Sequence, residues 1–172
     1  MAIHKIVYYP DPVLRKKAES VTEFGEDLQT LIDDMFETMY HARGVGLAAP
    51  QIAISKRISV IDATQDKSHQ LVIINPEIID REGTEKMQEG CLSVPGAYET
   101  VVRSTWVKIR ALDRHGKEFE MEGEGLLGEA FQHEIDHLNG KLFIDLLSGL
   151  KLSRAKKKLA EFKRTGIKNP KE

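Results

Sequence analysis

The sequence predicts an α+β fold, in which antiparallel sheets pack around a central helix and further helices lie near the N-terminal and C-terminal ends. Three observations support this prediction. Apolar residues recur at helical spacing in three segments of the chain. Runs of β-branched residues lie between the first and the second of these segments. The resulting order of helix, strands, helix and helix is typical of helices packed on antiparallel sheet.

The length and the composition suit a single globular domain. The chain has 172 residues, of which 41% are hydrophobic and 30% are charged. No apolar run approaches the roughly 18 residues that a membrane span needs. The N-terminus lacks the long apolar segment of a secretory signal. We therefore expect a cytoplasmic protein that does not enter a membrane. The single cysteine, Cys91, excludes an intramolecular disulfide.

The first predicted helix lies between Gly25 and Gly44. One face of it carries a continuous apolar stripe, formed by Leu28, Leu31, Ile32, Met35, Phe36, Met39 and Tyr40. Small residues and a proline in the segment 44–51 predict a loop or a tight turn. Strands are predicted at 58–61 and at 71–74, and Asn75-Pro76 is expected to end the second strand.

The remaining elements follow from alternation and from helix end signals. A β-hairpin is expected in residues 107–121, because apolar and polar residues alternate on both sides of a turn at 114–116. A second helix is expected over about 125–139, where an Asn-Gly pair supplies the C-terminal signal. A third is expected over 148–166. Its apolar side is formed by Leu152, Ala155, Leu159 and Phe162.

The charges are distributed unevenly along the chain. Residues 151–172 contain nine Lys or Arg against two Glu, a local balance of +7, whereas the first 150 residues carry 16 positive and 25 negative charges, a balance of −9. We therefore expect a domain at 1–150 and a basic helical extension of it at 151–172. The extension is either a docked helix with a solvated basic face or a contact for RNA phosphates.

Residues 133–137 have the sequence His-Glu-Ile-Asp-His, which is an H-E-x-x-H motif. His133 and His137 are four residues apart, so on a helix both imidazoles lie on one face and can reach one metal ion. Glu134 lies beside the first of them, where its carboxylate can hold a metal-bound water and take its proton. The alternative is a chance pattern on a solvated helix, but the apolar neighbours Ile135 and Leu138 favour a buried site.

A catalytic metal of this kind commonly has three protein ligands. The acidic candidates downstream of the motif are Asp145, Glu161 and Glu172, and none is compelling. Upstream, Cys91 is preceded by a glycine and followed by Pro95, which indicates an irregular backbone that could hold a thiol in place. A lone cysteine is more often an inert buried thiol. Here its context and the strength of a thiolate ligand favour Cys91 as the third ligand.

Three segments together resemble the peptide deformylase family. They are Gly44-Val45-Gly46-Leu47-Ala48-Ala49-Pro50-Gln51, Glu89-Gly90-Cys91-Leu92-Ser93 and Gln132-His133-Glu134-Ile135-Asp136-His137, in the family's order. The resemblance implies an α+β fold around the H-E-x-x-H helix. It implies Cys91, His133 and His137 as the ligands of one divalent metal, typically Fe(II), with zinc, nickel or cobalt as substitutes.

The activity implied by this resemblance is removal of the formyl group from N-terminal formylmethionine of nascent polypeptides, with release of formate. Glu134 would act first as general base and then as general acid. The developing oxyanion would accept hydrogen bonds from the side-chain amide of Gln51 and from the backbone N–H of Leu92. Taken without the family, Gln51 is more simply a surface amide after a turn.

The family pattern also implies where the substrate lies. Gly46 belongs to a segment that pairs with the peptide as a strand would. The expected wall of the methionine pocket is formed by Val45, Met87, Leu126 and His133. Leu126 could equally belong to the core.

Predictions can also be made for further residues near the site. Glu89 and Arg103 are expected to form an ion pair that braces the cysteine loop, unless the pair is solvent-exposed and contributes little. Ala97-Tyr98 is expected at the outer subsites. Glu129 departs from expectation, because it falls on a helix turn near the pocket where an apolar residue is expected.

The resemblance further implies a monomer whose basic C-terminal segment docks on the ribosome. Two other functions fit the residues. A general H-E-x-x-H peptidase would have no need of Cys91, and a ribosome-associated binding protein would hold its metal in a closed structural site.

Overall fold

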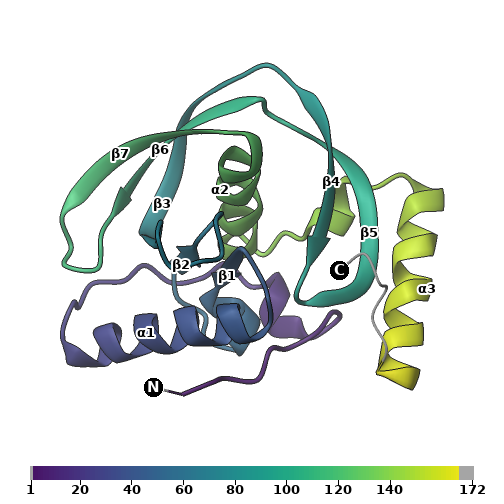
Figure 1. The fold of residues 1–172 in the computed structure, drawn as a ribbon, viewed down its shortest axis with the longest axis horizontal. Helices are drawn as coiled ribbons and strands as arrows, with labels where there is room; N and C mark the ends of the chain where they lie inside the picture. The colour runs from purple at the N-terminus through teal and green to yellow at the C-terminus, as the bar shows by residue number, and fades with distance from the viewer. Residues whose placement is uncertain (1, 167–172) are drawn as a thin grey trace.

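The computed structural model describes residues 2–166 and has the expected α+β architecture (Figure 1). One antiparallel sheet has the strand order β1-β2-β3-β6-β7, and β4 and β5 form a second, two-stranded sheet. The elements are η1 (Pro12–Arg15), α1 (Glu26–His41), β1 (Gly46–Ala48), η2 (Ala49–Ile52), β2 (Ile58–Ile61), β3 (Leu71–Glu82), β4 (Glu85–Cys91), β5 (Val94–Arg103), β6 (Trp106–Leu112), β7 (Glu118–Glu124), α2 (Gly125–Leu138), η3 (Phe143–Leu146) and α3 (Gly149–Thr165).

Helix α1 forms where the apolar stripe predicts it. Ile32, Met35 and Met39 are fully buried, and they pack in one cluster with residues of β1 and β2 such as Leu47 and Val60. The helix ends at His41, shortly before the predicted stop at Gly44. It therefore holds the segment that follows it, which forms one edge of the site.

Two strand boundaries differ from the sequence prediction. Strand β3 does not end at Asn75-Pro76 but continues to Glu82, with a register shift against β6 between Ile74 and Glu77. The pair lies within this irregularity, where the missing N–H of proline costs no ladder hydrogen bond. Residues 46–48, predicted as part of a loop, form the short strand β1 against β2.

The β4–β5 hairpin has no counterpart in the sequence prediction, which expected irregular backbone around Cys91. Cys91 ends β4, opposite Val94, and Leu92 and Ser93 form the turn. The pairing register shifts between Gly90 and Cys91, so the backbone next to Cys91 is irregular, as expected. Strand β4 has no apolar alternation to reveal it, because its inward-facing positions include Glu89, which is buried as an ion rather than as a hydrophobe.

Helix α2 is the central helix, as predicted, and Figure 1 shows it beneath the curved strands of both sheets. Ala130, Phe131 and Ile135 pack against buried residues of β2, β3 and β6. The helix approaches β7 so closely that a Cβ at Gly128 would lie 2.7 Å from the carbonyl oxygen of Gly123. This packing fixes the axial rotation of α2, and with it the direction of the H-E-x-x-H side chains.

Helix α3 packs along β5 at the outer side of the molecule (Figure 1). Ala155 and Leu159 are buried in a cluster with Val94 and Val101 of β5, as the apolar side of the segment predicts. The end of the predicted extension, residues 167–172, lies outside the described residues. Within residues 2–166, no helix combines the length and the apolar character that crossing a membrane requires.

Candidate metal centre and active site

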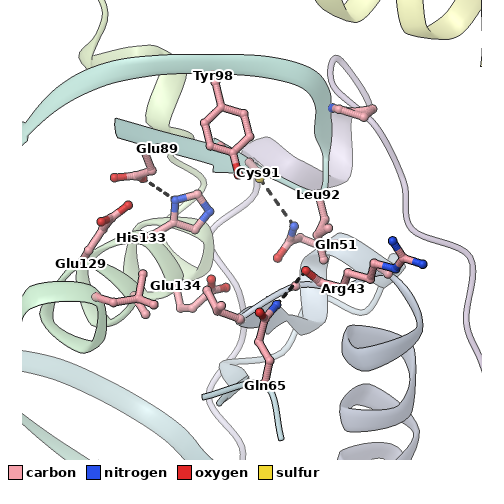
Figure 2. A pocket seen from close by; sticks show the side chains of 18 of the residues that line it. Arg43, Gln51, Gln65, Glu89, Cys91, Leu92, Tyr98, Glu129, His133 and Glu134 are labelled. Carbon is pink, nitrogen blue, oxygen red and sulfur yellow. Dashed lines mark hydrogen bonds and ion pairs between the residues drawn. The ribbon is translucent and has the colours of Figure 1, made fainter. Parts of the chain in front are cut away.

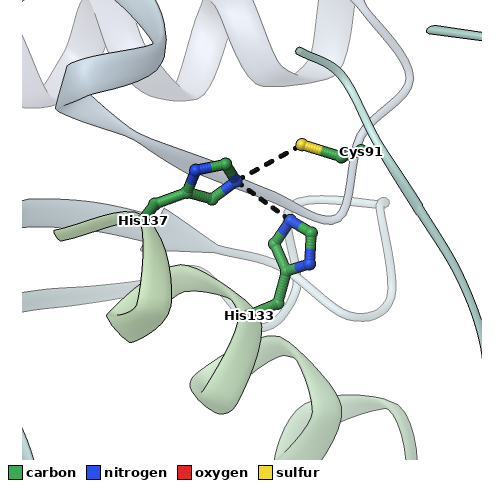
Figure 3. Close-up of side chains that lie close together, drawn as sticks. All are labelled: Cys91, His133 and His137. Carbon is green, nitrogen blue, oxygen red and sulfur yellow. Dashed lines mark hydrogen bonds between the residues drawn. The ribbon is translucent and has the colours of Figure 1, made fainter. Parts of the chain in front are cut away.

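Helix α2 and the end of β4 bring three ligand atoms together (Figure 3). The Sγ of Cys91 lies 3.3 Å from Nε2 of His137, which lies 3.1 Å from Nε2 of His133. All three atoms are within 4.8 Å of one another. One thiol and two imidazoles directed at a common point match the donor set of a tetrahedral Zn- or Fe-type centre that keeps one position open. The side chains therefore fit a single metal ion.

The acidic alternatives lie elsewhere. Asp145 accepts hydrogen bonds from Arg15 at 2.6 and 3.0 Å, and Glu161 is exposed on α3. Glu172 lies outside the described residues. Burial lowers the pKa of His137 well below its ordinary value, which favours the neutral imidazole that a metal ligand must be.

A buried ion-pair network contacts Nδ1 of His133, the ring nitrogen that is not part of the ligand cluster. This nitrogen lies 2.5 Å from Glu89 Oε1, and Arg103 donates to both oxygens of Glu89 at 2.6 and 3.0 Å. Arg103 also donates to Asp136 at 2.7 Å. Burial alone would raise the pKa of Glu89, but the hydrogen bonds from His133 and Arg103 outweigh it and lower the pKa to about 2. The pair is thus buried, and the solvent-exposed alternative is wrong.

Glu134 is buried next to His133 on α2, and its carboxyl group lies against Gly46 of β1. Its Oε1 accepts a hydrogen bond from Ser59 at 3.4 Å, and its Oε2 lies so close to Gly46 that a Cβ there would be 2.5 Å away. Burial raises the pKa of Glu134 to about 7. A carboxyl group with such a pKa can both accept and return a proton near neutral pH.

Gln51 is 1% exposed, so the interpretation as a surface amide is wrong. Its Oε1 accepts a hydrogen bond from the backbone N–H of Ala48 at 2.9 Å, which fixes the orientation of the amide. Its Nε2 then donates to Ser93 Oγ at 3.1 Å and faces Cys91 Sγ at 3.6 Å. Leu92 is the first residue of the two-residue turn, a position whose N–H the hairpin ladder does not use.

These side chains open into a pocket of about 660 Å³ (Figure 2). Val45, Gly46 and Leu126 line it, as expected, and Leu126 is 46% exposed rather than part of the core. Met87 is not among the residues that line this pocket, whereas Glu89, two residues further along β4, is one of them. Tyr98 lines the pocket, but Ala97 faces the opposite side and is buried in the α3 cluster.

Three other contributions were missed by sequence reasoning. Ser59 and Ser93 hold Glu134 and Gln51, respectively, and both serines are fully buried. At the pocket mouth, Gln65 donates a hydrogen bond to the carbonyl oxygen of Arg43 at 2.9 Å. Ser93 lies within a segment that carries the family resemblance and could have been singled out there. Ser59 and Gln65 carry no local signal.

Glu129 lines the pocket as a charged group where an apolar one was expected. Figure 2 shows its side chain on the same side of α2 as His133, directed toward Glu89. Burial, together with the neighbouring Glu89 carboxylate, raises the pKa of Glu129 to about 7.

Comparison with known proteins identifies the family. The model of the polypeptide deformylase family matches residues 3–153. The chain belongs to this family. It is 54% identical over 168 residues to a peptide deformylase of Acidobacterium capsulatum, covering 96% of this chain and 99% of the relative. It is 57% identical to one of Hahella chejuensis, covering 90% and 93%. The crystal structure of a peptide deformylase from Legionella pneumophila superimposes with a TM-score of 0.95 at 62% identity, covering 98% and 100%.

Family membership confirms the resemblance drawn from the three segments. Deformylases remove the N-formyl group from nascent polypeptides and use a single catalytic metal, so the predicted hydrolase activity is confirmed at this level. The fold that this chain shares with deformylases brings Cys91, His133 and His137 together in a group that could hold one metal ion.

Proposed function

We propose that this chain deformylates N-formylmethionyl peptides with Cys91, His133 and His137 as metal ligands and Glu134 as the proton-transferring residue. The observation that carries the proposal is the convergence of the three ligand atoms beside the buried Glu134, at the end of an open pocket. When bound, a divalent metal would supply Lewis acidity and would lower the pKa of a bound water to about 7. The residues of the protein perform the other steps.

Glu134 moves the proton between the two halves of the reaction. Its carboxylate takes a proton from the attacking water as the oxygen adds to the formyl carbon. It then delivers this proton to the amide nitrogen as the carbon–nitrogen bond breaks. The second proton of the water passes from the formic acid to the amine, which leaves formate and a protonated N-terminal amine. The pKa of about 7 suits both directions of transfer, and Ser59 holds the carboxyl group in position.

Gln51 Nε2 and the N–H of Leu92 stabilise the negative charge that develops on the formyl oxygen. The bond from Ala48 to Gln51 Oε1 turns Nε2 toward the site, where Nε2 donates to Ser93 Oγ and faces Cys91 Sγ. Donors that are oriented before the reaction stabilise the transition state without reorganisation. The two donors belong to separate elements, η2 and the β4–β5 turn, and both can donate hydrogen bonds to the same oxygen.

The substrate backbone binds along β1. This strand lies at the edge of the five-stranded sheet, where it offers unpaired backbone groups to an added strand. Gly46 and Val45 line the pocket at this edge, and Leu126 faces them from α2. Recognition through the peptide backbone explains how one site serves many nascent chains.

We propose Fe(II) as the native metal, because this ion is typical of the family that the chain resembles. The thiolate and imidazole donors suit zinc, nickel and cobalt as well. Metal analysis of protein prepared without oxygen, followed by reloading with each ion, tests this assignment. Activity that was highest with zinc and unchanged by iron would contradict it.

The first test of the function is formate release from formyl-Met-Ala-Ser by protein prepared anaerobically. We expect turnover by the wild type and a loss of about 100-fold to 10,000-fold for Glu134→Ala, since general acid–base catalysis contributes 10²–10⁴-fold. The variant should keep its metal, because Glu134 is not a ligand. An active Glu134→Ala protein would remove this residue from the mechanism.

We further propose that residues 1–150 form the catalytic domain and 151–172 a basic extension that contacts the ribosome. Part of the basic charge of α3 is used within the protein, because Arg154 bonds Glu99 and Lys163 bonds the carbonyl oxygen of Tyr9. Lys156, Lys157 and Lys158 are exposed and available to RNA phosphates. Their triple reversal to Glu should weaken ribosome binding and spare hydrolysis of formyl-Met-Ala-Ser. Unchanged ribosome affinity would refute the contact.

The proposed site is complete within one chain, and we propose that the protein acts as a monomer in the cytoplasm, where nascent chains are made. Sedimentation at micromolar concentration should give the mass of one chain, 19.4 kDa.

A further inference from the structure

Glu129 has no role in the proposed reaction, yet its side chain lies where the substrate binds. It precedes His133 by four residues on α2, so the two side chains share one helix face. Glu129 lines the pocket together with Leu126 and Ala130, and Figure 2 shows its carboxyl group directed toward Glu89 and the His133 ring. The wall that α2 gives to the pocket is therefore partly apolar and partly acidic.

The positive charges nearest to this carboxyl group belong to His133 and Arg103, and both of these side chains already bond Glu89. Within residues 2–166, Glu129 forms no ion pair with a lysine, arginine or histidine. The guanidinium of Arg103 is already used by Glu89 and Asp136. The neighbour that Glu129 does contact, Glu89, is itself an acid. Among the residues that the structure describes, the pocket thus holds a carboxyl group that contacts another acid, Glu89, and has no ion-pair partner.

The position of Glu129 relative to the reacting centre indicates which part of the substrate it meets. The formyl carbon must lie beside Glu134 and the ligand cluster. The Cα of the first substrate residue is two bonds away, roughly 2.5 Å from the formyl carbon. From that centre the pocket continues along the face of α2 that precedes His133, toward Leu126. The first side chain of the substrate therefore lies against the wall that carries Glu129.

We propose that Glu129 is a specificity-determining residue, whose carboxyl group lets the pocket accept a first side chain ending in a cation or hydrogen-bond donor as well as methionine. An apolar wall would reject an ammonium group, since burial without a partner is unfavourable. A carboxylate offers the charge-assisted hydrogen bond that offsets this loss. This inference rests on the proposed function and extends it to the substrate side chain.

The test uses two substrates that differ only at the end of the first side chain. Formyl-norleucyl-Ala-Ser and formyl-lysyl-Ala-Ser, formylated on the α-amine, share the same four-carbon chain, and lysine adds the ammonium group. The ratio of kcat/KM for the lysyl to the norleucyl peptide is measured for wild type, Glu129→Gln and Glu129→Leu. We expect this ratio to fall at least tenfold in Glu129→Leu and by an intermediate factor in Glu129→Gln.

A matched control is Leu126→Ala, one turn away on the same wall. It removes apolar contact from both side chains, so it should lower both values of kcat/KM and leave their ratio unchanged. Metal content and melting temperature are measured for every variant. If Glu129→Leu does not fold, the nearly isosteric Glu129→Gln carries the test.

The outcomes separate this inference from the proposed function. If the wild type releases no formate from formyl-Met-Ala-Ser, the proposed function fails. If it cleaves that peptide but the lysyl to norleucyl ratio agrees within twofold among the three proteins, the specificity role of Glu129 is overturned. A ratio that falls equally in Leu126→Ala would also overturn it, because the effect would then be one of pocket size.

Discussion

Gly46 lies against the carboxylate of Glu134, in space that a methyl group would need. A Cβ at this position would lie 2.5 Å from Glu134 Oε2, so Gly46→Ala must displace that carboxyl group. Displacement of a catalytic group by about 1 Å can cost about 100-fold in rate, and we expect such a loss in kcat/KM with formyl-Met-Ala-Ser. Gly149→Ala is the control, because no atom lies within 4 Å of its added Cβ. Full activity of Gly46→Ala would show that Glu134 can move freely.

In the proposed mechanism Ser93 acts through Gln51, whose amide donates to Ser93 Oγ in a hydrogen bond of 3.1 Å. A bond of this kind contributes about 1 kcal/mol, so Ser93→Ala should lower kcat by roughly fivefold to tenfold, with little change in KM. A double-mutant cycle checks the route. In a Gln51→Leu background, Ser93→Ala should cause no further loss. Equal losses in both backgrounds would mean that Ser93 serves only the fold.

Among the proposed metal ligands, His133 and His137 are the easiest to predict, because helical spacing alone places them together. Cys91 required its context and the family resemblance. Met87 stays a prediction: it shares a face of β4 with Glu89, which lines the pocket, but Met87 is not among the lining residues. Ser59 was missed, because its hydroxyl reaches Glu134 only after β2 and α2 have packed.

At the scale of elements, α3 offers a comparison of two leucines. Leu159 is 4% exposed and packs on β5, whereas Leu150, on the same helix, is 71% exposed. Truncation of a buried leucine costs about 2–4 kcal/mol, so Leu159→Ala should lower the melting temperature by roughly 5–15 °C in a chain of this size. Leu150→Ala should leave it within about 1 °C. Equal shifts would mean that α3 is not docked on β5 in solution.

Helices were easier to predict than strands. The apolar stripes of α1 and α3 are visible in the sequence, and their ends were placed within a few residues. The β4–β5 hairpin was missed because Glu89 replaces an apolar residue on its inner face, and β3 was cut short because Pro76 resembles a strand end. In each case a tertiary contact overrides the local signal.

At the scale of the whole molecule, the proposed metal ligands come from different parts of the fold. Cys91 belongs to the two-stranded sheet, and both histidines belong to α2, which packs on the five-stranded sheet. A ligand present at 100 times its Kd stabilises the native state by about 2.7 kcal/mol, so a chelator should lower the melting temperature by roughly 5–10 °C. The melting temperature of Cys91→Ala should respond much less to the chelator. An equal response would place the metal elsewhere.

The fold class could be predicted because it depends only on the order and type of the elements, which the sequence reveals. The arrangement of the two sheets could not, since strand order and the separation of β4–β5 from the main sheet depend on long-range pairing. Periodicity does not reveal which segments meet in space. The resemblance to a known family does, because the three matching segments form one site in that family's fold.

The pocket draws on residues from β1 to α2, and β5, which carries Tyr98, is held in place by α3. The backbone of Lys158 lies directly against Gly96, where a Cβ would be 3.1 Å from the Lys158 carbonyl oxygen. The last described helix to be synthesised therefore supports a wall of the site. A chain still under synthesis lacks this support until α3 has been made, so β5, which carries Tyr98, is braced only late in synthesis.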